Sequence, residues 1–91
     1  MTYTFRDYYV PDRMMPALKR YVEKHEGSGD FLMAVLRNDL SGAVGHADLE
    51  NLQNLPAYVG YLYNEVPSPC WGSPEKVEAW LKNKSHLRVV K

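Results

Sequence analysis

The clearest pattern along this chain is a series of aliphatic residues in its second half. They recur at alternating steps of three and four residues, at Leu52, Leu55, Val59, Leu62 and Val66. This spacing predicts a central helix whose aliphatic face points inward and packs against another helix. Asn54 can cap a new helix that has Pro56 near its beginning, which predicts a kink after the preceding segment, residues 48–53.

The first half of the chain shows two shorter helical patterns. A first helix begins near Asp12, and its buried face holds Met14, Leu18, Tyr21, Val22 and His25. Gly27 to Gly29 supply the turn that ends it. A second helix follows, capped by Ser28 or Asp30. Its predicted buried stripe is Leu32, Val35, Leu36 and Leu40.

The second helix is expected to break at Asn38–Asp39, because both side chains compete for backbone hydrogen bonds. Gly42 and Gly45 then predict a short helix or an irregular joint. Residues 67–72 contain two prolines and predict a rigid connector. Ser73, followed by Pro74 and Glu75, is typical of the residues that begin a helix, and it predicts the start of the last helix.

Together these patterns predict a mostly α fold in a single domain, residues 1–91. The expected architecture is a compact bundle of about four helices with a kinked central helix. Short extended segments are expected at both ends, because residues 3–10 and 87–90 have the composition of β-strands. Pairing between these two segments would join the ends of the chain.

Charge narrows the range of functions. The formal net charge is zero, which gives little drive for binding nucleic acid or a membrane surface. No Lys or Arg occurs between Arg37 and Lys76, whereas the C-terminal segment is basic. Such segregation suits either complementary surfaces between subunits or two ordinary solvated surfaces. A chain of only 91 residues buries little surface alone, so a homo-oligomer is expected.

Candidate chemistry is sparse. The only cysteine, Cys70, rules out an internal disulfide and a cysteine-based zinc site. The histidines are far apart, and the only local cluster with metal-ligand character is His46 with Asp48 and Glu50, at offsets that do not share a helix face. We therefore expect no catalytic residues, no metal and no cofactor, and hence no enzyme. Since no apolar run is long enough to cross a bilayer, we expect a cytoplasmic protein without a membrane partner.

The stronger candidate for a binding surface is the polar side of the central helix. Tyrosine and asparagine offer flat contact area and adaptable hydrogen bonds, which suit recognition of a base, a sugar or a protein surface. A tryptophan in the proline-rich turn would add an aromatic wall, and an arginine would meet a phosphate or cap its own helix. The predicted ligand-binding residues are Asn51, Asn54, Tyr58, Tyr61, Arg37 and Trp71. The structural alternative is that these side chains only satisfy one another in the core.

Two segments carry a resemblance to a known group of proteins. NLPAYVGYLYN, residues 54–64, and CWGSPEKV, residues 70–77, resemble segments of small uncharacterised accessory proteins of tailed bacteriophages. The likeness extends over most of the chain and implies a setting, the bacterial host cytoplasm, without an activity. In that setting we expect a non-catalytic counter-defence or host-takeover protein that sequesters a small nucleotide signal as a homo-oligomer. The alternative is a protein–protein inhibitor of a bacterial host enzyme or defence protein.

Overall fold

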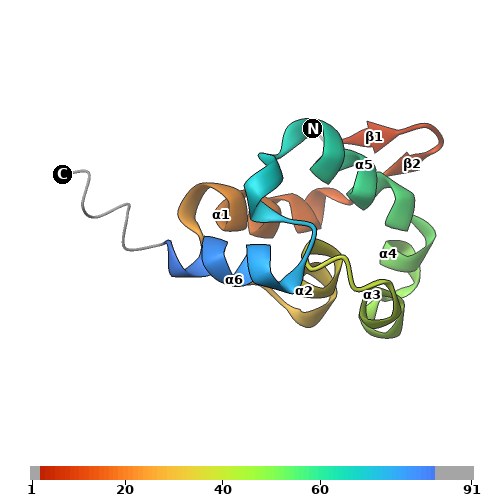
Figure 1. The fold of residues 1–91 in the computed structure, drawn as a ribbon. Helices are drawn as coiled ribbons and strands as arrows, with labels where there is room; N and C mark the ends of the chain where they lie inside the picture. Colours follow the sequence, from red (N-terminus) through yellow and green to blue (C-terminus); the bar gives the residue numbers. More distant parts are fainter. Residues whose placement is uncertain (1–2, 84–91) are drawn as a thin grey trace.

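The chain begins with a small β-hairpin. The computed structural model describes residues 3–83, and its ribbon is shown in Figure 1. Strands β1 (Thr4–Phe5) and β2 (Tyr8–Tyr9) pair antiparallel. Arg6 lies in the turn between them with φ 55°, a left-handed conformation that a tight turn requires. The N-terminal segment is thus extended as predicted, and the expected pairing with residues 87–90 lies outside the described residues.

Helices make up most of the remaining described chain. The α-helices are α1 (Met15–Lys24), α2 (Asp30–Leu36), α3 (Leu40–His46), α4 (Leu49–Gln53), α5 (Leu55–Glu65) and α6 (Pro74–Lys82). Two 3₁₀ turns, Asp12–Met14 and Ser68–Cys70, precede α1 and α6. The mostly helical, compact fold is confirmed, but residues 3–83 form six α-helices rather than about four.

The boundary between α2 and α3 follows the local stereochemistry of two residues. Asn38 has φ 62°, which ends α2, and the Asp39 side chain then caps α3 by accepting a hydrogen bond from the Gly42 N–H. The predicted break is therefore confirmed. Leu40 was expected in the buried stripe of the second helix, and this was wrong. The new helix direction leaves Leu40 68% exposed.

The kink between α4 and α5 is also confirmed. Asn54 lies at the junction and Pro56 follows in the first turn of α5. The Asn54 side chain does not cap α5, because its Nδ2 donates to the Glu50 carbonyl and its Oδ1 accepts from the Tyr9 N–H. The same amide therefore ties the hairpin to the kink.

The predicted inward face of the central helix was wrong in part. Leu62 and Val66 are buried, but Leu52 is 41% exposed and Val59 is 49% exposed. Tyr58 is fully buried instead, with its ring edge-to-face against Phe31 at 5.0 Å between centroids. Burying a tyrosine removes roughly 150–250 Å² from water, which is more area than a valine side chain can bury, and the gain is roughly proportional to the apolar part of that area. The orientation of α5 that buries the Tyr58 ring is therefore favoured, provided that the Tyr58 hydroxyl forms a hydrogen bond.

Helix α6 packs against the core beside α1. The Ser73 side chain accepts a hydrogen bond from the Lys76 N–H, as expected for the predicted cap. Trp80 stacks on His25 with centroids 4.1 Å apart, and its indole N–H donates to the Tyr21 carbonyl. The Nδ1–H of His25 in turn donates to the Trp80 carbonyl at 2.7 Å. These contacts hold α6 against the C-terminal end of α1, as the ribbon in Figure 1 shows.

Candidate functional site

The predicted recognition surface on the central helix does not exist as a free surface. Asn51, Asn54 and Tyr58 are buried. The Tyr58 hydroxyl donates to Asn51 Oδ1, which gives the buried phenol the partner it needs. Burial raises the pKa of Tyr58, so the phenol stays a neutral donor. The structural alternative therefore holds, because Tyr58 and Asn51 satisfy one another and Asn54 bonds to the Glu50 carbonyl and the Tyr9 N–H.

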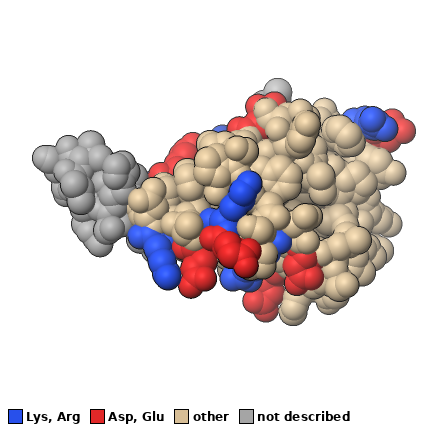
Figure 2. Space-filling model, in the orientation of Figure 1, with Lys and Arg blue, Asp and Glu red and all other residues tan. Residues whose placement is uncertain are grey.

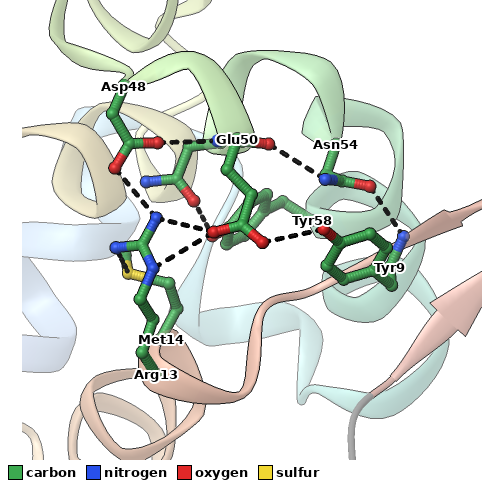
Figure 3. A network of polar contacts seen from close by, with 8 residues as sticks. Tyr9, Arg13, Met14, Asp48, Glu50, Asn54 and Tyr58 are labelled. Carbon is green, nitrogen blue, oxygen red and sulfur yellow. Dashed lines mark hydrogen bonds and ion pairs between the residues drawn. The ribbon is translucent and has the colours of Figure 1, made fainter.

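The other three predicted residues do not complete a pocket with them. Tyr61 is half-buried, lies edge-to-face with Tyr3 at 5.3 Å, and has its pKa raised mainly by burial. Arg37 is exposed just beyond α2, and half-buried Trp71 packs against the core. The Gly72 N–H donates to the Leu36 carbonyl, so the segments of Arg37 and Trp71 meet at the end of α2. Asn54 and Tyr58 instead lie at the α4–α5 kink (Figure 3), where Tyr58 is hydrogen-bonded to Asn51 of α4.

An ion-pair network that the sequence did not reveal lies beside these residues (Figure 3). Arg13 pairs with Asp48 at 2.9 Å and with Glu50 at 3.1 Å. Tyr9 donates its hydroxyl to Glu50 Oε2 at 2.7 Å. The Asn51 N–H is the main cause of the lowered Asp48 pKa, with Arg13 adding to it, while Tyr9 and then Arg13 lower the pKa of Glu50. Both carboxylates are thus occupied in joining the hairpin and the start of α1 to α4.

The histidines and the cysteine show no catalytic arrangement in residues 3–83. His25 is buried against Trp80, and exposed His46 lies 4.0 Å from Asp30. Burial raises the pKa of the Cys70 thiol to about 11, which keeps it protonated and unreactive at neutral pH. No group of three His, Cys, Asp or Glu side chains within these residues could hold a metal ion. His86 falls outside the described residues.

The feature that stands out is an apolar groove between α3 and α5. A hollow of about 250 Å³ lies between the two helices. Its apolar lining consists of Val35, Leu40, Ala43, Leu55, Pro56 and Val59. Asn38 and Asp39 are the polar residues of the same lining. The hollow therefore combines a buried floor with the two aliphatic side chains, Leu40 and Val59, that were expected in the core.

A second hollow lies beside the first, between α5 and the hairpin. It has a volume of about 380 Å³ and shares Pro56 and Val59 with the first hollow. Phe5, Gly60, Tyr63 and Asn64 complete its lining. The Phe5 ring lies so close to Gly60 that an added Cβ there would come within 2.7 Å of the ring, so only glycine permits this approach of the hairpin. We call the two adjoining hollows the α3–α5 groove.

Exposed hydrophobic side chains surround the groove. Of the eight large hydrophobic residues exposed in the described chain, six lie on α3, α4 and α5, two on each helix. They are Leu40, Val44, Leu49, Leu52, Val59 and Tyr63. In Figure 2 the surface over these helices, at the right, is almost free of charged side chains, while Lys and Arg gather around α6. Three of the six, Leu40, Val59 and Tyr63, line the groove. Large exposed apolar patches on small proteins mark interaction sites, so the groove is the candidate functional site.

Comparison of the chain with protein-family models, with curated proteins and with solved structures finds no match. Over the described part of the chain, no helix is both long and apolar enough to cross a membrane. The assignment of a function therefore depends on the surface itself.

Proposed function

We propose that this protein acts without catalysis, by binding another protein through the α3–α5 groove. The observation that carries the proposal is a preformed apolar hollow whose lining includes the exposed side chains of Leu40 and Val59. Leu40 is 68% and Val59 is 49% exposed, so covering them in an interface would contribute a corresponding share of the roughly 1.5–3 kcal/mol that full burial of an aliphatic side chain gives. Apolar centres of this kind are typical of protein–protein interfaces.

The nucleotide-sequestering function that the sequence first suggested has less support. The amide and phenol groups of Asn51, Asn54 and Tyr58 are used in hydrogen bonds inside the protein. The lining of the groove contains no Lys or Arg to meet a phosphate. A nucleotide site would need both kinds of group within reach. We therefore favour the protein-binding alternative.

The resemblance to tailed-bacteriophage proteins places this activity in a setting. In that setting the partner is a bacterial host enzyme or defence protein, and the phage protein inhibits it stoichiometrically in the host cytoplasm. An apolar groove with no catalytic group nearby suits such a role, because occupation of a partner's surface is sufficient for inhibition.

A pair of matched variants tests the proposal. Leu40 and Leu49 each follow an aspartate cap at the first position of their helix, and they are 68% and 70% exposed. Only Leu40 lines the groove. Leu40→Gln should weaken partner binding at least tenfold, whereas Leu49→Gln should change it far less. Both variants should unfold at the wild-type temperature, because both side chains face solvent.

The assay is quantitative affinity capture from bacterial lysate with the three proteins side by side, followed by calorimetry with the purified partner. A partner that all three proteins capture equally would refute a groove-based function. Thermal shifts with a nucleotide panel, run in parallel, would reveal the nucleotide alternative as stabilisation by a member of that panel.

A further inference from the structure

The lining of the α3–α5 groove limits which backbone conformation can occupy it. Apart from Asn38, Asp39, Asn64 and the Tyr63 hydroxyl, the lining side chains are hydrocarbon. An extended segment placed there would leave peptide N–H and C=O groups without partners, at roughly 1–3 kcal/mol for each buried group. An α-helix satisfies its backbone internally and presents only side chains to an apolar groove. Helix α5 lines both hollows and α3 lines the first, so a third helix can pack against helices there, while Phe5 of the hairpin forms the other wall of the second hollow.

Charges of opposite sign lie at the two ends of the groove. Asp39 lines the α3 end, and its Oδ1 accepts only the capping N–H of Gly42, at 3.0 Å. At the other end, the Arg6 guanidinium carbon lies 5.1 Å from the centroid of the Phe5 ring, which lines the second hollow. Within residues 3–83, neither Asp39 nor Arg6 forms an ion pair. Asp7 is in the same turn as Arg6, but only the arginine stacks on the groove wall.

The dimensions of the groove fit a short helix. The rise from Pro56 to Tyr63 along α5 is about 10 Å at 1.5 Å per residue. A helix of three turns is about 16 Å long, which covers this stretch of α5. Such a helix would place apolar side chains in the groove at positions i, i+3 or i+4, and i+7.

We infer that the groove binds an amphipathic α-helix of a partner protein, with a basic residue of that helix near Asp39 and an acidic residue near Arg6. This inference rests on the proposed protein-binding function and names the partner element. The apolar stripe supplies the affinity, and the two end charges set the direction in which the helix lies.

Selection from a displayed library of random 16-residue peptides on the full chain tests this inference. The enriched peptides should share apolar residues at helical spacing, with a basic residue toward one end and an acidic residue toward the other. Their binding should fall at least tenfold on Leu40→Gln and less than twofold on Leu49→Gln. Asp39→Asn and Arg6→Asn should each weaken it about two- to fivefold. Asparagine retains the helix cap at position 39 and tolerates the positive φ at position 6.

Three outcomes would overturn the helical occupant. The first is enrichment of peptides with apolar residues at alternate positions, which indicates an extended segment. The second is that the selected peptides bind the Leu40→Gln variant as tightly as the wild type. The third is self-association that rises with protein concentration in sedimentation and is abolished by Leu40→Gln. That result would mean that a second copy of this chain occupies the groove. If a captured protein still needs Leu40 while no helical peptide is selected, the proposed function stands without this inference, and if nothing depends on Leu40 both fail.

Discussion

Replacing Tyr58 with phenylalanine tests whether the central helix is held by its buried polar pair. The substitution removes only the hydroxyl that donates to Asn51 Oδ1, and both residues are buried. Asn51 would then keep an unpaired acceptor away from water, which costs about 1–3 kcal/mol. In a domain of this size 1 kcal/mol lowers the melting temperature by about 4–8 °C, so we expect a fall of roughly 4–20 °C.

Tyr61→Phe is the matched control on the same helix. Tyr61 is half-buried, and its hydroxyl has no hydrogen-bond partner among residues 3–83. Its loss should change the free energy of unfolding by less than about 0.5 kcal/mol. Urea unfolding followed by tryptophan fluorescence and circular dichroism gives both values, and an unchanged m-value would show that only stability has changed.

The double variant Asn51→Leu/Tyr58→Phe completes the test. It removes both partners, so it should recover part of the stability that Tyr58→Phe loses. The reasoning would be refuted if Tyr58→Phe were as mild as Tyr61→Phe. Loss of ligand or partner binding by Tyr58→Phe at unchanged stability would instead restore Tyr58 as a recognition residue.

Two further perturbations test contacts of the hairpin and of α4. Gly60→Ala should destabilise the protein by about 1–2 kcal/mol in thermal unfolding, because the Phe5 ring must move, whereas Gly45→Ala has open space and should stabilise it by about 0.5–1 kcal/mol. The pKa values of Asp48 and Glu50 are lowered from 3.8 and 4.5, so the stability they contribute is present above pH 4.5 and is lost as pH falls through their lowered values. Urea midpoints measured against pH should therefore fall less steeply below pH 4.5 in Asp48→Asn/Glu50→Gln than in the wild type, and equal slopes would contradict the ion-pair assignment.

The element boundaries were predictable because their signals are local. Ser73 caps α6, Pro56 lies in the first turn of α5, and Asn38 with Asp39 divides α2 from α3. Each signal acts through a side chain on backbone groups within about four residues. No tertiary contact is needed to form it, so the printed sequence contains it in full.

The face of α5 that is buried was not predictable in the same way. Two patterns with helical spacing overlap in this segment, one through Leu55 and Val59 and another through Asn54 and Tyr58. Periodicity alone cannot choose between them, and the choice is made by the contact with Phe31, which is remote in sequence.

The ion-pair network had no local signal either. Arg13 is separated from Asp48 by 35 residues and from Glu50 by 37. Only the grouping of Asp48 and Glu50 near the start of one helix could be seen in the sequence. In the sequence these two acids could be related only to the nearby His46, whereas in the structure both carboxylates form ion pairs with Arg13.

The exposure of Val59 follows from the burial of Tyr58. Adjacent residues of an α-helix point about 100° apart. Because Ala57 and Tyr58 are both fully buried, Val59 points away from the buried face between them. On the facing helix, the left-handed turn at Asn38 turns Leu40 outward in the same way. Two side chains that pattern alone assigned to the core thus become lining residues of one groove. Because the core contacts set the groove and not the reverse, substitutions of Leu40 should change binding without changing stability, whereas Tyr58→Phe should weaken stability first and binding only through it.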